Sequence, residues 1–190
     1  MTLYSLALFV HVVGVLVLFM GIGLQWIIVQ RLSKAQTVAQ VREGTSLIAL
    51  QEKLWPTAAL LILLAGIYMT VTAWGWRTPW IDLSLAALIG QGAVAGALIN
   101  RRLKAIHTGV TATEAPAGAF PPGLKRQIAD PVLRAAVQIN AIMGLGVVFL
   151  MTTKPGLVGS LITLAVALLL GIVTGRVFWR PGEEAMKRAV

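Results

Sequence analysis

Long uncharged apolar stretches alternate with short charged segments along the whole chain. An α-helix rises about 1.5 Å per residue, so about 20 apolar residues suffice to cross roughly 30 Å of hydrocarbon. Five stretches reach that length, at about Leu3–Gln30, Leu54–Trp74, Pro79–Ile99, Leu133–Thr153 and Leu157–Phe178. The pattern therefore predicts an all-α fold, a single membrane domain over residues 1–190 built as a bundle of five transmembrane helices.

The first stretch lacks a basic N-terminal segment and a small-residue cleavage site, so we expect it to remain in the mature protein. After it, Val38, Val41 and Leu47 can share one helix face, which predicts a surface helix over about 31–53. Pro56 then lies at the start of the second spanning helix, where proline is tolerated. The segment 108–123 is rich in Ala, Thr, Pro and Gly, which predicts a flexible cytoplasmic loop over about 104–130.

Composition and charge agree with a membrane protein. Of 190 residues, 57% are hydrophobic and 12% are charged, which is not how a water-soluble domain is built. The net charge of +9 suggests nucleic-acid binding at first, but of the 16 Lys and Arg residues only Arg77 and Lys154 fall on one side of the predicted spans. Basic residues gather on the cytoplasmic side, so we expect the N-terminus outside and the C-terminus in the cytoplasm. Because the chain has no cysteine, disulfides and thiolate metal sites are excluded.

The most informative polar residue at bilayer depth is His11. It lies about eight residues into the first span, on the order of 12 Å deep, where an uncharged imidazole can still bind a metal. Gly14 and Gly21 fall near the same helix face and would leave room for a flat macrocycle bound to His11. Alternatively, the glycines let a neighbouring helix or a second subunit approach closely, and His11 hydrogen-bonds to that helix.

If His11 binds haem iron, a second axial ligand must come from a similar depth. Met69 and Met143 are the candidates, because a thioether can complete haem coordination with histidine. Plain packing is the more common role of each such methionine, and a five-coordinate iron or a ligand from a second subunit stays open. His107 is excluded by its cytoplasmic position, where we expect a solvated loop residue.

The other polar and aromatic residues of the spans have simpler expected roles. Gln91, Gln138 and Asn140 are expected to hydrogen-bond across helices, and Trp74, Trp76 and Trp80 to anchor the outer interface. Asp82 is expected to pair with Arg77. No carboxylate lies deep in any span, so general acid and base chemistry is not predicted, and a cofactor would have to carry any redox reaction.

Two short motifs carry a family resemblance. The first-helix sequence LFVHVVGVLVLFMGIG, and the fourth-helix features Arg134, Asn140 and MTTKPG, resemble an uncharacterised bacterial integral-membrane family. That family is related to copper-resistance protein D and to the HemJ-type protoporphyrinogen oxidase. The resemblance implies a haem b or porphyrin site in a helical bundle of the bacterial cytoplasmic (inner) membrane, with His11 at the position of the family's first-helix histidine. The oxidases carry a lysine near the start of the third helix after a tryptophan, whereas this chain reads Trp80, Ile81, Asp82, so the resemblance does not extend to protoporphyrinogen oxidation.

Three functions follow from these observations. The first is a membrane b-type haem protein, in electron transfer, redox or gas sensing or haem handling, with a haem-dependent oxidoreductase activity and a redox partner as extensions. The second is copper or small-solute permeation, although the six methionines form no repeated ligand motif. The third is a non-catalytic accessory subunit, in which His11 and the amides only pack helices. Nucleic acid is not an expected partner, whereas the lipid bilayer is.

Overall fold

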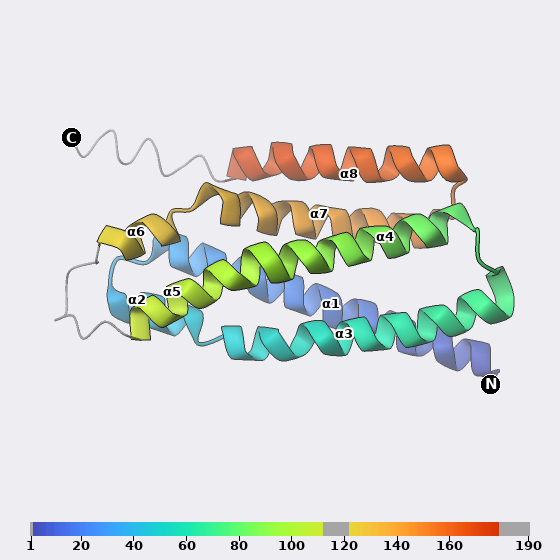
Figure 1. Ribbon diagram of the computed structural model, residues 1–190, viewed down its shortest axis with the longest axis horizontal. Helices are drawn as coiled ribbons and strands as arrows, with labels where there is room; N and C mark the ends of the chain where they lie inside the picture. Colours follow the sequence, from blue (N-terminus) through green and yellow to red (C-terminus); the bar gives the residue numbers. More distant parts are fainter. Residues whose placement is uncertain (1, 112–121, 179–190) are drawn as a thin grey trace.

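A computed structural model describes residues 2–111 and 122–178 of the protein, and Figure 1 shows their arrangement. The elements in chain order are α1 (Leu3–Lys34), α2 (Val38–Thr45), α3 (Ile48–Met69), the π-helix η1 (Thr70–Trp74), α4 (Pro79–Val94), the π-helix η2 (Ala95–Asn100), α5 (Arg101–Thr111), α6 (Pro122–Ile128), α7 (Pro131–Thr153) and α8 (Leu157–Phe178).

Five helical segments in the described part of the chain are long and apolar enough to cross a membrane. They are α1, α3 with η1, α4 with η2 and α5, α7, and α8. Large apolar side chains such as Phe9, Leu16 and Leu64 are exposed on them, as expected of surfaces that face lipid. The predicted all-α bundle of five spanning helices is therefore confirmed, and a multi-pass association with the bilayer fits it.

The first connecting segment differs from the predicted single surface helix over 31–53. α1 continues to Lys34, a separate short α2 follows, and α3 already begins at Ile48. The break arises because Thr37 and Gln40 form a capping box that starts a new helix. Pro56 consequently lies inside α3 rather than at its start, so that prediction was wrong.

The predicted loop over 104–130 is also largely helical where the structure describes it. Residues 104–111 extend the third span as α5, and α6 covers Pro122–Ile128. The apolar positions Leu103, Ile106 and Val110 recur at helical spacing and are buried, which explains the extension. Residues 112–121, the centre of the predicted loop, lie outside the described residues.

The helices run side by side, so the bundle has two distinct ends (Figure 1). We call the end at Leu3, Trp74, Pro79 and Thr153 the tryptophan end, and the end formed by Lys34, α2, α5 and α6 the basic end. α1 packs mainly on α3, α4 on α7, and α8 on α7. Small residues permit the contact between α7 and α8. A Cβ at Gly146 of α7 would lie 2.8 Å from an atom of α8, and a Cβ at Gly171 of α8 would lie 2.9 Å from an atom of α7.

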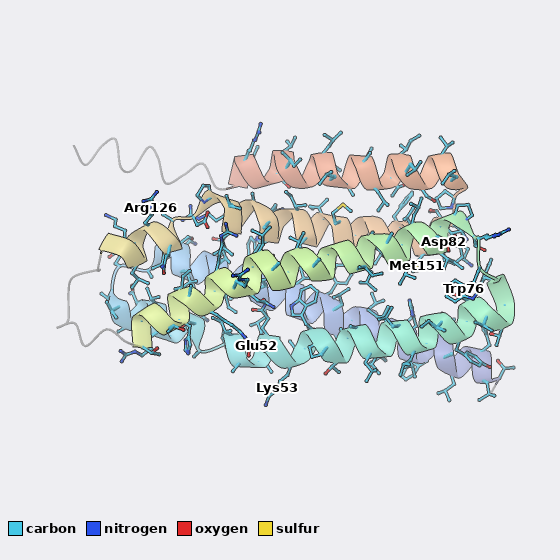
Figure 2. All side chains as sticks on the ribbon, viewed as in Figure 1. Glu52, Lys53, Trp76, Asp82, Arg126 and Met151 are labelled. Atoms are coloured by element: carbon cyan, nitrogen blue, oxygen red, sulfur yellow. The ribbon has the colours of Figure 1, made fainter. Side chains whose placement is uncertain are left out.

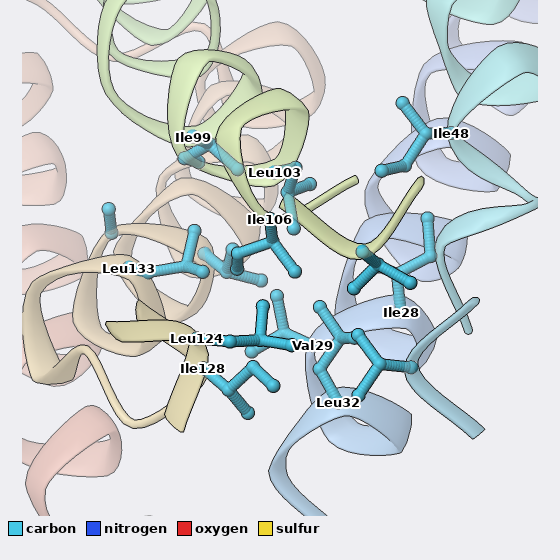
Figure 3. Close-up of a cluster of buried hydrophobic side chains, with 14 residues drawn as sticks. Ile28, Val29, Leu32, Ile48, Ile99, Leu103, Ile106, Leu124, Ile128 and Leu133 are labelled. Atoms are coloured by element: carbon cyan, nitrogen blue, oxygen red, sulfur yellow. The ribbon is translucent and has the colours of Figure 1, made fainter. Parts of the chain in front are cut away.

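The basic end is filled by one apolar cluster (Figure 3). It joins α1, α2, α3, η2, α5, α6 and α7 through fully or nearly fully buried aliphatic side chains, among them Ile28, Leu32, Leu103, Ile106 and Leu133. Two ion pairs lie beside it, with Arg102 Nε 2.6 Å from Asp130 Oδ2 and Lys104 Nζ 2.8 Å from Glu52 Oε1. The short helices α2, α5 and α6 thus close this end of the bundle.

Candidate functional site

The tryptophan end contains a cavity of about 460 Å³ between α1, α3, α4 and α7. Its volume lies within the range of about 300–1,000 Å³ that is typical of small-molecule and cofactor sites. The cavity exists because α3 packs on α1 and α4 packs on α7, whereas α3 and α4 make no extensive contact with each other. Its walls are mainly Leu, Val and Ile side chains, with a few polar groups between them.

His11 is the only histidine in the cavity wall, and α3 fixes its orientation. The side chain is 8% exposed, and its Nδ1 lies 3.1 Å from the backbone oxygen of Ile62. A carbonyl can only accept a hydrogen bond, so Nδ1 carries the proton and Nε2 keeps its lone pair. No hydrogen-bond partner of Nε2 is found among residues 2–111 and 122–178. A backbone carbonyl bound to one ring nitrogen is the usual orienting contact of a metal-binding histidine.

Gly66 makes room for the imidazole on α3. A Cβ at this position would lie 3.4 Å from both Cε1 and Nδ1 of His11. A methyl group at that distance would be in van der Waals contact with the ring, so Gly66 leaves the imidazole its space on this side. The sequence analysis did not single out Gly66, because its role depends on the antiparallel register of α1 and α3.

Gly14 does not line the cavity, although it lies one turn from His11. A Cβ there would come within 2.9 Å of Ile62 Cγ1 and Leu61 Cβ, so Gly14 allows the close approach of α1 to α3. Gly21 also faces α3, with Leu54 Cβ 3.7 Å from its ideal Cβ position. Both glycines therefore pack against α3, and a role of Gly14 beside a cofactor stays a prediction.

The two methionines proposed as second ligands have different positions. Met69 is buried and lines the cavity together with His11. Met143 is not part of the cavity wall, because α7 faces the cavity with Gly144, Val147, Val148 and Met151. This stripe has the spacing of one helix face, and Met143 lies outside it. Met151, which Figure 2 shows at the tryptophan end, is the methionine of α7 that lines the cavity.

The cavity opening holds a cation between aromatic rings. Lys154 Nζ lies 4.2 Å from the ring centroid of Trp74 and 5.8 Å from that of Trp80, and these two rings meet edge to face at 5.3 Å. Trp74 Nε1 donates a hydrogen bond to Tyr4 Oη at 3.3 Å. All four residues line the cavity. The tryptophans predicted as interface anchors therefore also form the opening, and Lys154 was missed because its partners come from other helices.

Two buried polar side chains, Ser84 and Gln91, face the cavity from α4. Ser84 Oγ and Gln91 Nε2 have no hydrogen-bond partner among the described residues. Buried polar atoms are costly when unpaired, so both are available to a ligand or to water. They add hydrogen-bonding capacity to an otherwise apolar wall.

Several residues considered in the sequence analysis lie apart from this cavity. His107 is half-buried at the basic end on α5, where its Nδ1 lies 3.1 Å from Thr45 Oγ1, so it is not the predicted loop residue. Asp82 and Arg77 are both exposed, and the ion pair predicted between them is not formed. Gln138 donates to Thr174 Oγ1 at 3.2 Å, which is the interhelical hydrogen bond expected of it.

The donor set of the cavity fits a macrocycle better than a bare metal ion. Within residues 2–111 and 122–178, no group of three or more His, Asp or Glu side chains could hold a metal ion. A single oriented imidazole nitrogen is sufficient only when a chelating ring supplies the other ligands. The residues present thus fit a haem b that would be held through His11.

Comparisons with protein-family models, with curated proteins and with solved structures each found no match to this chain.

Proposed function

We propose that the protein is a membrane-bound b-type haem protein in which Nε2 of His11 is an axial ligand. The observation that carries this proposal is the single imidazole held by the Ile62 carbonyl in the wall of a 460 Å³ apolar cavity. An apolar cavity with one oriented nitrogen donor and few polar groups is how helical bundles hold cofactors.

Other residues of the cavity support the same ligand. Met69 and Met151 offer thioethers for the second axial position. Lys154, at the opening, offers a positive charge to the carboxylates of the macrocycle, which favour the polar rim over the apolar interior. A bound haem would supply one-electron chemistry or gas binding, and the protein residues would orient it and exclude water.

We further propose that the tryptophan end faces the outside of a bacterial cytoplasmic membrane. Among the described residues, that end carries two basic side chains, Arg77 and Lys154. The remaining described Lys and Arg side chains lie at the basic end. The haem would then lie in the outer half of the bilayer, where it can exchange electrons with a partner on that side. Electron transfer and redox or gas sensing are the functions that suit this position.

The test is an absorption spectrum of the purified protein. The protein is expressed with haem precursor supplied and purified in mild detergent, and oxidised and dithionite-reduced spectra are recorded. We expect a Soret band and a reduced α-band that His11→Ala abolishes. His107→Ala is the matched control, because it removes the other histidine at the opposite end of the bundle, and it should keep both bands. A colourless wild-type protein, or equal bands in His11→Ala, would contradict the proposal.

A further inference from the structure

Below the cavity, toward the basic end, the interior of the bundle contains side-chain amides that lack partners. Gln25 is 0% exposed and Asn140 is 2% exposed, and neither the nitrogen nor the oxygen of either side chain has a hydrogen-bond partner among the described residues. Gln51 Oε1 and Gln91 Nε2 are likewise buried and unpaired in the described part of the chain. These four residues come from α1, α3, α4 and α7.

The packing register brings Gln25 and Gln51 to the same level. Gly21 of α1 lies against Leu54 and Trp55 of the antiparallel α3. Four residues further along α1 is Gln25, and four residues back from Trp55 is Gln51. Both side chains are buried, so they lie at one depth inside the α1–α3 pair.

The packing of α7 on α1 and α4 brings Asn140 and Gln91 close to the level of Gln25. Gly144 of α7 lies against Ile22 of α1, and one turn further toward the basic end Asn140 comes level with Gln25. Gln91 Oε1 lies 3.6 Å from the ideal Cβ position of Gly144, which places the amide one turn above Asn140. Because Gln91 also lines the cavity, the amides begin at the cavity floor and continue away from it.

At its other end the row of amides reaches the surface of the basic end. Gln51 Nε2 donates to Asn100 Oδ1 at 3.4 Å, and Asn100 closes the π-helix η2. π-helical turns inside α-helices often mark functional sites. Glu52, next to Gln51, forms the exposed ion pair with Lys104 of α5, and Figure 2 shows Glu52 near the start of α3. The apolar cluster beyond Ile28 and Ile99 fills the bundle axis, so a path from Gln51 to the surface would have to leave on this side.

We propose that Gln25, Gln51, Gln91 and Asn140 hold a chain of water molecules that conducts protons between the cavity and the Glu52–Lys104 pair. A buried amide without a partner is costly, and water is the smallest ligand that can satisfy both its donor and its acceptor atoms. Each water accepts a proton from one neighbour and passes another on, so one proton leaves for each that enters and no protein bond changes. The proposal is independent of haem binding.

Proton flux through the reconstituted protein tests the proposal. The purified full chain is placed in phosphatidylcholine vesicles that contain a pH-sensitive dye, and a potassium diffusion potential with valinomycin drives protons inward. We expect faster acidification than in protein-free vesicles, and a loss of at least about tenfold of this flux in Gln25→Leu and Asn140→Leu, because an apolar side chain interrupts a water chain.

The matched control is Gln138→Leu, which removes a buried amide from the same helix two residues before Asn140 but on the side of α8. It should conduct like the wild type. Asn140→Ser keeps a hydrogen-bonding group and should retain most of the flux, which separates loss of the path from loss of folding. A wild type no faster than protein-free vesicles, or an equal loss in Gln138→Leu and Asn140→Leu, would overturn the proposal.

Discussion

Both ends of the bundle contain aliphatic side chains of the long helices, but these side chains are packed differently. At the basic end, α2, α5 and α6 add aliphatic side chains to the main helices, and residues such as Val41, Leu103 and Val110 are completely buried. At the tryptophan end no short helix of the described residues packs between α3 and α4, which make no extensive contact with each other beside the cavity. A firmly packed end fixes the helix positions, so the other end can stay hollow for a ligand.

The largest expected effect is on the free energy of unfolding, when a leucine of the basic-end cluster is compared with a leucine of the cavity wall. Leu133 is 1% exposed inside the basic-end cluster, whereas Leu85 lines the cavity and is only half-buried. Leu133→Ala should lower the free energy of unfolding by about 2–5 kcal/mol, because it leaves a void in a closely packed core. Leu85→Ala should cost less than half as much.

Both leucine variants are measured by unfolding in mixed detergent micelles, with secondary structure followed by circular dichroism. Equal losses for the two variants would show that the two ends are packed alike.

A second, smaller effect separates a packed glycine from an exposed one on the same helix. Gly14→Ala places a Cβ 2.9 Å from Ile62 and Leu61 of α3, and overpacking of this kind costs about 1–3 kcal/mol of stability. At Gly23 nothing lies within 4 Å, so Gly23→Ala should be neutral or stabilise the helix by up to about 1 kcal/mol. Thermal unfolding of the two variants in the same detergent gives the comparison; a destabilised Gly23→Ala would point to a partner on that face.

The smallest expected effect concerns the charge at the cavity opening. Lys154→Gln removes the cation that lies over Trp74, and under the proposed function it should weaken haem binding about tenfold, the size of one charged hydrogen bond. Arg77→Gln, at the same end but outside the cavity wall, should leave the affinity nearly unchanged. Haem titration followed at the Soret band measures both, and added salt should reduce the difference between them.

Much of the fold could be predicted from hydrophobicity alone. A membrane-spanning helix must be long and apolar, so each of the five spans is visible in the sequence without knowledge of its neighbours. The prediction was wrong where the chain leaves the bilayer. The single surface helix over 31–53 was predicted from apolar residues that share a helix face, and the loop over 104–130 from composition, but capping at Thr37 and contacts to the basic-end cluster determine the helices there.

The candidate site was predicted only in part. His11 stood out because a histidine at bilayer depth is rare, and its position in a cavity wall keeps the ligand hypothesis open to test. The choice between Met143 and Met151 depended on which face of α7 turns inward. Gly144, Val147, Val148 and Met151 form the face of α7 that turns toward the cavity. A helix that faces lipid on one side and protein on the other has two apolar faces, and the sequence does not show which of them is the inner one.

The sequence by itself determined that five helices are long and apolar enough to cross a membrane, because hydrocarbon excludes unpaired backbone groups and charged side chains wherever the neighbours lie. Only the tertiary structure decided what the polar residues inside the bundle do. His11 and the Ile62 carbonyl lie 51 positions apart in the chain, and Gln25 and Asn140 share a level only through the antiparallel register of α1 and α7. Such contacts between distant residues depend on the packing of small residues between helices, and no local pattern in the sequence predicts them.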